Sequence, residues 1–243
     1  MSRKHIDGGT MEVGGNPIPI DIVINPRARR LILRLDRDRR VRVTCPSKRH
    51  VKDALRMANE RRPWIKTQLE ETPTPIPFVA GRVLPVLGQQ YQIVRAEKAR
   101  SAARFEGDMI ITGGQTEAAL ARRVETLLRQ EVLKICTQKA EEYANALDVH
   151  IGSISTRQMT SRWGSCGTNG NICFNWRLVF APLHVLHYVI AHEVAHRVYM
   201  DHSPGFWATV QQLDPHYEKA AQWLKHHGAE LYAYGQPSPK DQS

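Results

Sequence analysis

Two histidines and a glutamate form the clearest chemical motif in the sequence, His192-Glu-Val-Ala-His196. Residues four positions apart lie on one face of a helix, so one tetrahedral metal ion can bridge both imidazoles. Glu193 lies one residue around the helix, where its carboxylate can take a proton from a water molecule that the metal activates. The spacing therefore predicts a zinc site with Glu193 as the general base.

A catalytic zinc ion needs a third protein ligand and one open position, and His202 is the predicted third ligand. It lies six residues beyond His196, just past the expected end of the helix, so the chain can turn and bring its imidazole back. Ser203-Pro204 is typical of a new helix start, which would define that turn. Asp201 and Glu218 are the alternative ligands. We expect one Zn²⁺ per chain, and a fourth protein ligand would indicate structural zinc instead.

The motif alone has limited specificity, because random ordering of these residues would produce it in about three sequences per hundred. Its context strengthens it, since no proline interrupts the apolar segment between Pro182 and Pro204. His184 and His187 precede His192 by eight and five residues, and we interpret them as core or surface residues. Helix-surface positions are predicted for His216, His226 and His227.

The elements around the motif predict a helical core with a flanking hairpin. Apolar residues recur at helical spacing from 116 to 147, and residues 151–173 read as strand, turn and strand. The motif helix is expected from Pro182 to about Met200. Two short helices follow, opened by Ser203-Pro204 and by Asp214-Pro215.

The first half of the chain is predicted to be rich in β-structure. Residues 18–44 alternate as a hairpin with one basic face, a helical pair follows over 47–69, and residues 83–111 form further short strands. The proline-rich segment 72–77 reads as an extended connector and a candidate subdomain boundary. Residues 1–17 and 236–243 are predicted to be flexible tails.

Composition indicates a soluble globular protein, with 42% hydrophobic and 24% charged residues. The longest charge-free stretch, 178–192, is too short to span a bilayer and contains three histidines, so no membrane span is predicted. The N-terminus lacks the apolar run of a signal peptide, which predicts a cytoplasmic location.

The four cysteines form no Cys-x-x-Cys pair, so a zinc ribbon is not expected and the thiols are expected to be reduced. A two-residue turn at Asn169-Gly170 would pair Cys166 with Cys173 across two strands. We interpret both as small buried hydrophobic residues rather than as a redox switch.

The net charge of +10 raises the question of an acidic partner such as nucleic acid. The densest basic runs, 27–30, 34–42 and 56–66, all lie in the first third of the chain. Because the basic residues are spread out and can simply be solvated, a nucleic-acid partner is not the favoured interpretation.

Several spaced motifs occur in one order over about residues 160–240. They are Arg162-Trp-Gly-Ser-Cys166, Gly170-Asn-Ile, Asn175-Trp-Arg-Leu178, Ala181-Pro182, Tyr188 to His196, His202 to Trp207 and Pro215-His-Tyr217. Together they resemble the motifs of the YgjP-like metallopeptidases, and more distantly those of the SprT-like and other zincin peptidases. The resemblance implies that His192, His196 and His202 bind zinc and that Glu193 is the general base. By analogy, the strand with Trp163 and Gly164 would flank the cleft and pair with an extended peptide.

We therefore predict an α+β protein with a β-rich part over 18–113 and a zincin-like metallopeptidase domain over 114–235. Its predicted function is hydrolysis of peptide bonds in a peptide or protein substrate. The alternative is a basic nucleic-acid-associated zinc protein, which would act on DNA-bound proteins or use zinc structurally.

Overall fold

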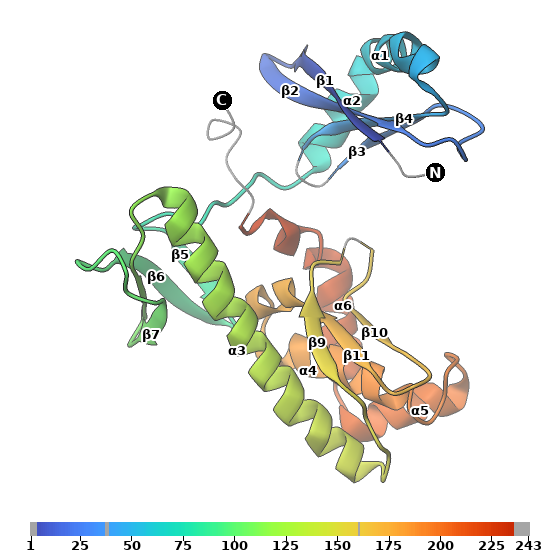
Figure 1. Ribbon diagram of the computed structural model, residues 1–243. Coiled ribbons are helices and arrows are strands. Elements are labelled where there is room, and N and C mark those ends of the chain that lie inside the picture. The colour runs from blue at the N-terminus through green and yellow to red at the C-terminus, as the bar shows by residue number, and fades with distance from the viewer. Residues whose placement is uncertain (1–3, 37–38, 160, 236–243) are drawn as a thin grey trace. The chain divides into compact units, whose positions relative to one another are not determined.

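The computed structural model describes residues 4–36, 39–159 and 161–235, and it confirms the α+β class (Figure 1). The chain divides into two compact units, Met1–Pro75 and Ile76–Ser243. The division falls inside the proline-rich connector 72–77 and differs from the predicted boundary between 113 and 114. The reason is that the strands of residues 83–112 share one hydrophobic core with the helices that follow them. The predicted tail 236–243 lies outside the described residues.

The first unit contains a four-stranded sheet in the order β1-β2-β4-β3. β1 pairs with β2 and β3 with β4 in antiparallel fashion, whereas the central pair, β2 and β4, is parallel. The strands are β1 (Lys4–Val13), β2 (Asn16–Ile24), β3 (Ile32–Leu35) and β4 (Val41–Cys45).

Strand β1 occupies much of the segment that the sequence predicted to be a flexible tail. Its residues Met11 and Val13 are buried, and the strand pairs with β2 along its length. The register shifts between Asp7 and Thr10, where Gly9 has a φ of 77°. This glycine bulge breaks the alternation of apolar and polar residues, which hid the strand from the sequence pattern.

Two helices, α1 (Val51–Glu60) and α2 (Arg62–Glu71), follow a 3₁₀ turn, η1 (Lys48–His50), and cover one face of this sheet. Pro63 lies in the first turn of α2, as the sequence predicted, because a proline there loses no helical hydrogen bond. Ala54, Ala58, Ile65 and Leu69 pack against the buried strand residues. The first unit therefore has a hydrophobic core of its own.

The second unit begins with another four-stranded sheet, β5-β6-β8-β7, whose order and strand directions match those of the first sheet. Thr116 then caps a long helix, accepting a hydrogen bond from the amide of Ala119 at 3.2 Å. These elements are β5 (Val83–Val86), β6 (Gln89–Arg95), β7 (Arg104–Glu106), β8 (Met109–Thr112) and α3 (Glu117–Ala146).

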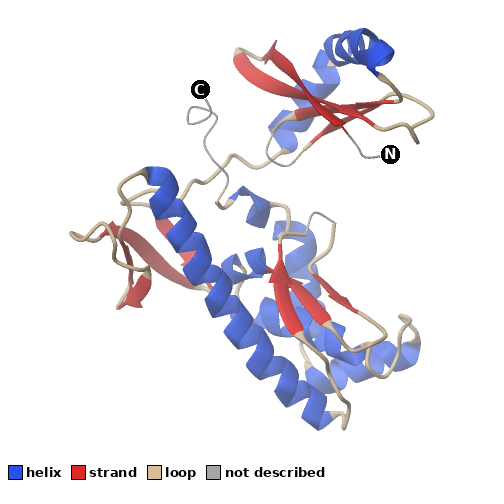
Figure 2. Cartoon of the chain, viewed as in Figure 1, coloured by secondary structure: helices blue, strands red, loops and turns tan. Residues whose placement is uncertain are grey.

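A three-stranded sheet and a group of helices complete the second unit (Figure 2). The sheet has the order β10-β11-β9, so β10 lies at an edge. No helix among the described residues is both long and apolar enough to cross a membrane. The elements are β9 (Ile154–Arg157), β10 (Gly164–Cys166), β11 (Ile172–Asn175), η2 (Trp176–Phe180), α4 (Leu183–Ala195), α5 (Pro204–Leu213), α6 (Tyr217–His227) and η3 (Glu230–Ala233).

The predicted pairing of Cys166 with Cys173 is wrong by one position. Cys166 pairs with Ile172, and Cys173 pairs with Ser165, so the two cysteines belong to different faces of the sheet. The turn contains three residues rather than two, because Gly167 and Asn171 still form a hydrogen bond and Gly170 adopts a φ of 82°. All four cysteines are free thiols.

Candidate metal centre

Helix α4 carries the motif and crosses the core of the second unit. Val185, Leu186, Val189 and Ile190 are buried, and α4 contacts α3, α5 and α6. The helix ends at Ala195, earlier than the predicted end near Met200. The backbone tightens there, since the amides of Arg197 and Val198 donate to the carbonyls three residues before them. His196 therefore stands at the C-terminal cap of the helix.

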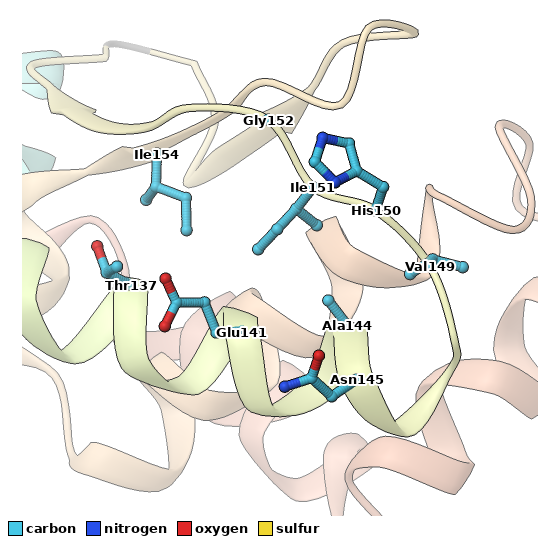
Figure 3. A pocket seen from close by; sticks show the side chains of 9 residues that line it. All are labelled: Thr137, Glu141, Ala144, Asn145, Val149, His150, Ile151, Gly152 and Ile154. Atoms are coloured by element: carbon cyan, nitrogen blue, oxygen red, sulfur yellow. The ribbon is translucent and has the colours of Figure 1, made fainter.

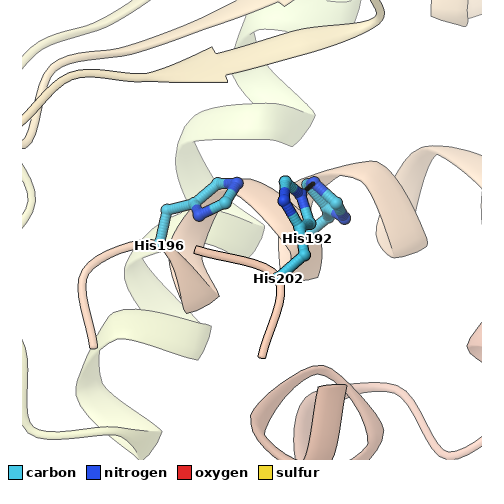
Figure 4. Close-up of side chains that lie close together, drawn as sticks. All are labelled: His192, His196 and His202. Carbon is cyan, nitrogen blue, oxygen red and sulfur yellow. Dashed lines mark hydrogen bonds between the residues drawn. The ribbon is translucent and has the colours of Figure 1, made fainter. Parts of the chain in front are cut away.

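The chain after α4 turns back and brings His202 to the motif. The Asp201 carboxylate accepts a hydrogen bond from the amide of Ser203 at 3.1 Å, and Pro204 starts α5 directly afterwards. His202 Nε2 lies 3.2 Å from His192 Nε2. Figure 4 shows the rings of His192, His196 and His202 gathered beyond the end of α4.

The three imidazoles have the spacing that one metal ion needs. Their ligand nitrogens all lie within 4.8 Å of one another. Nitrogens bound to a tetrahedral zinc ion at about 2.0–2.1 Å are roughly 3.3 Å apart. The donor set of three imidazoles also suits zinc and similar transition metals. These residues therefore fit a metal ion, with only small adjustments of the rings.

Two features favour the neutral, metal-binding form of these histidines. Burial, together with the neighbouring imidazoles of His196 and His202, lowers the pKa of His192 to about 4. His196 Nδ1 lies 3.0 Å from the carbonyl oxygen of Tyr199. Because a carbonyl only accepts, Nδ1 must be the protonated nitrogen, which leaves Nε2 free to bind a metal.

Glu193 is buried beside the histidines, with a relative exposure of 5%. Burial raises the pKa of its carboxyl group to about 8, and the charge of Arg162 opposes this shift. The carboxylate fits closely against β10, because a Cβ atom added to Gly164 would lie 2.3 Å from Glu193 Oε1. The glycine thus leaves the space that the carboxylate occupies.

Aromatic side chains pack against the three histidines. The Phe206 ring is fully buried, and its centroid lies 4.9, 4.6 and 4.8 Å from those of His192, His196 and His202. Trp207 stacks on Tyr217 with a centroid distance of 5.5 Å. Helix α5 therefore both ends the turn that carries His202 and holds the imidazoles in place.

A cavity of about 290 Å³ opens in front of the cluster, between α4 and the edge strand β10. Arg162 and Met200 also line it, and both side chains are exposed. The cavity therefore brings together three imidazoles that could hold a metal ion, a buried carboxylate that could accept a proton, and the edge of a strand.

A family model described as YgjP-like, metallopeptidase domain, matches residues 29–227 of the chain. The chain belongs to this YgjP-like family. The match covers residues 29–75 of the first unit, so β1 and β2 lie outside it, and residues 76–227 of the second unit, including the clustered histidines. Neither the curated proteins nor the solved structures contained a match to this chain.

Within this YgjP-like chain, the structure separates the remaining site residues of the sequence prediction. Gly164 contacts Glu193, whereas the Trp163 ring packs against Tyr232, with centroids 4.9 Å apart, and does not line the cavity. Among the described residues, neither Asp201 nor Glu218 joins the three histidines. The same holds for the histidines at 184, 187, 216, 226 and 227.

Arg197 is a contact residue that sequence reasoning missed, although it directly follows the motif. Its Nε donates to the carbonyl of His150 at 2.9 Å, and its Nη1 donates to the carbonyl of Thr168 at 3.2 Å. These carbonyls belong to the segment before β9 and to the tip of the β10–β11 hairpin. One guanidinium therefore connects the residue after the C-terminal cap of α4 to the segment before β9 and to the hairpin whose strand β10 lines the cavity.

The second unit contains a larger cavity, of about 560 Å³, between α3 and the segment before β9 (Figure 3). It contains one carboxylate, from Glu141, and one imidazole, from His150, but none of the three clustered histidines. The larger cavity is therefore not the candidate site. The candidate site is identified by the convergence of three side chains that could bind a metal ion.

Proposed function

We propose that this YgjP-like chain is a zinc-dependent peptidase, with His192, His196 and His202 as zinc ligands and Glu193 as the general base. The observation that carries this proposal is the convergence of three imidazole nitrogens within 4.8 Å, beside a buried carboxylate. Its membership of a metallopeptidase family supports the same reaction.

The ligand count favours a catalytic ion over a structural one. Structural zinc sites have four protein ligands, whereas catalytic sites have three and an open position. In the part of the chain that the structure describes, only three residues form the cluster, and no cysteine or carboxylate completes it. His202 is exposed and lines the cavity, where a substrate would approach.

The residues around the cluster have distinct roles in the proposed reaction. When bound, zinc would act as a Lewis acid, which lowers the pKa of a water molecule to about 7 and polarises a peptide carbonyl. Glu193 takes the proton from the attacking water and then passes it to the leaving amine. Arg162, at the cavity wall, provides a positive charge near the peptide oxygen as that oxygen becomes negative.

The proposed substrate is an extended peptide that lies along β10. One edge of β10 is paired with β11 and the strand is at the end of its sheet, so an added chain can hydrogen-bond to its other edge. The cavity is lined by all three residues of β10, Gly164, Ser165 and Cys166, together with the three histidines. A peptide bound there would therefore present a carbonyl to the ion.

The test is zinc content per chain by elemental analysis after dialysis, combined with mass spectrometry of an unstructured peptide mixture. The natural protein should hold about one zinc ion and cleave peptides. His202→Ala should lose or weaken zinc, and Glu193→Gln should keep zinc but lose about 10²–10⁴-fold in hydrolysis. His184→Ala, an exposed histidine on the same helix, is the matched control and should change neither.

Two outcomes would contradict the proposal. Full zinc retention in His202→Ala would remove the third ligand from the site. Unchanged hydrolysis in Glu193→Gln, with normal zinc content, would remove the general base and require another residue to accept the proton.

A further inference from the structure

The positive charge of the protein is concentrated in the first unit. Residues 1–75 contain 17 Lys and Arg against 9 Asp and Glu, a net charge of +8. The remaining 168 residues carry only +2 of the total of +10. The small unit without the candidate metal centre therefore holds most of the charge.

The fold gathers part of this charge at one end of the sheet. Because β2 and β4 are parallel, both finish there, with Ile24 opposite Cys45, and Lys4 at the start of β1 pairs with Ile24. The amide of Asn25 donates to the carbonyl of Cys45 at 2.9 Å, which keeps the two following segments together. We define the basic end as Lys4, Arg27, Arg29, Arg30, Lys48, Arg49 and Lys52.

The cations of the basic end are not neutralised within the unit. All seven side chains are exposed, and within the described residues none of them forms an ion pair. Elsewhere in the unit, by contrast, Arg40 pairs with Asp21 and Arg42 with Asp36. The sequence contains no Asp or Glu from 22 to 35 or from 39 to 52. The basic end is therefore a separate positive surface.

We propose that the basic end binds the phosphodiester backbone of duplex nucleic acid. Lys4 starts β1, and the other six cations lie in the loop after β2 and in the segment after β4. The three strands are neighbours in the sheet and together span about 10 Å. Duplex DNA carries one negative charge per about 1.7 Å of its axis, counting both strands, so a length of duplex equal to this width carries roughly six phosphate charges. The number of cations matches that charge, and the binding does not depend on the proposed hydrolysis.

The residue types at the basic end favour a duplex over a single strand or a membrane. Single-strand binding relies on aromatic side chains that stack on bases, and the sequence has no Phe, Tyr or Trp before Trp64. Membrane-surface binding usually adds apolar side chains that enter the lipid. In the described part of the first unit, Trp64 on α2 is the only large apolar side chain classed as exposed, and it is not at the basic end. The residue types therefore favour contacts between these cations and the phosphates of a duplex, which depend on charge and not on base sequence.

The experiment measures binding of the full-length protein to a fluorescent DNA duplex of about 20 base pairs, at several salt concentrations between roughly 50 and 200 mM. One variant is Arg27→Gln/Arg29→Gln/Arg30→Gln, and a second is Lys48→Gln/Arg49→Gln/Lys52→Gln. The matched control, Arg61→Gln/Arg62→Gln/Lys66→Gln, removes the same charge from α2 and from Arg61, the residue before it. Lys66 contacts the turn between β1 and β2, at the opposite end of the sheet.

Each basic-end variant should weaken binding by at least about 10-fold at the lowest salt, and should reduce the slope of log affinity against log salt by about 2. The control should change the slope by less than about half that amount. Retained zinc content and an unchanged unfolding midpoint would show that the variants fold. Binding of an RNA duplex of equal length, compared with DNA, would identify the preferred duplex.

Three results would overturn the proposal. The first is no salt-dependent binding of any duplex by the natural protein. The second is an equal loss in all three variants, which would indicate diffuse charge rather than a site. The third is tighter binding to a single strand or to vesicles of anionic phospholipid than to the duplex.

Discussion

The two four-stranded sheets have the same strand order and the same strand directions, yet they belong to different kinds of structure. In both, two antiparallel hairpins meet at a central parallel pair, β2 with β4 in the first unit and β6 with β8 in the second. The arrangement of hydrogen bonds is therefore equivalent. What differs is the element that follows the last central strand.

After β4, two ten-residue helices pack back onto their own sheet and close a core that contains only first-unit residues. After β8, a single thirty-residue helix, α3, continues beyond its sheet and contacts η2, α4 and β9. Its buried residues join one core with the metal helix. Two sheets of the same topology thus differ in their cores. The first has a core of its own with two short helices, whereas the second shares its core with α4 through the longer helix α3.

The largest expected effect tests this contrast with a matched pair, Ile22→Ala and Ile93→Ala. Both residues are fully buried in a central strand, so each change should lower the free energy of unfolding by about 2–5 kcal/mol. Only Ile93→Ala should destabilise the unit with the proposed zinc site, because Ile93 shares its core with α4. Denaturant unfolding with and without added zinc measures both effects.

If the two units unfold separately, added zinc should raise the midpoint of the second unit's transition, which is the one that Ile93→Ala lowers. It should leave the midpoint of the first unit's transition, which Ile22→Ala lowers, unchanged. A single transition that both variants lower equally, and that zinc raises in both, would mean that the two units unfold together. The contrast between the two sheets would then be lost.

A second pair compares two crowded glycines. In Gly164→Ala the new Cβ would lie 2.3 Å from Glu193 Oε1, and in Gly8→Ala it would lie 2.9 Å from Ile20. We expect Gly164→Ala to keep zinc but to lose about 10²-fold or more in peptide hydrolysis, because Glu193, the proposed general base, is displaced. Gly8→Ala should lower stability and leave the turnover of folded protein unchanged. Equal activities in the two variants would contradict a role for Gly164 in placing Glu193.

Arg197→Ala examines how the second unit holds its site together. The change removes two charge-assisted hydrogen bonds to carbonyls, and we expect a loss of about 1–3 kcal/mol in stability. Arg197→Lys keeps the charge but not the two-pronged geometry, so it should recover only part of this. Thermal unfolding of the zinc-loaded variants provides the measurement, and full recovery by lysine would show that charge alone matters.

The smallest effect concerns the first unit and its pH dependence. The hydrogen bond from Arg40 holds the pKa of Asp21 below its ordinary value of 3.8. A lowered folded-state pKa contributes stability above pH 4, which is lost as the pH falls through the folded-state value. Because both side chains are partly exposed, we expect about 1 kcal/mol or less. Asp21→Asn should differ from the natural protein in denaturant unfolding at pH 7, and the difference should disappear as the pH falls through the lowered folded-state pKa of Asp21, because a protonated carboxyl has no charge to attract Arg40.

Much of the fold followed from local patterns. Helical spacing and Pro182 predicted α4, and Pro63 predicted the break between the first two helices. The strand β1 and the hairpin register did not follow, because each depends on a glycine in an unusual backbone conformation, Gly9 and Gly170. A glycine that bends the chain looks, in the sequence, the same as one in a loose tail or a shorter turn.

The sequence by itself determined which side chains could bind a metal at the end of α4, because helical periodicity places His192 and His196 on one face whatever surrounds them. It also indicated the turn that returns His202. Only the tertiary structure decided that Glu193 is buried against Gly164, that Arg197 joins the helix to the hairpin, and that seven dispersed cations lie at one end of a sheet. Those relations join residues far apart in the chain, so they depend on packing and strand pairing rather than on local spacing.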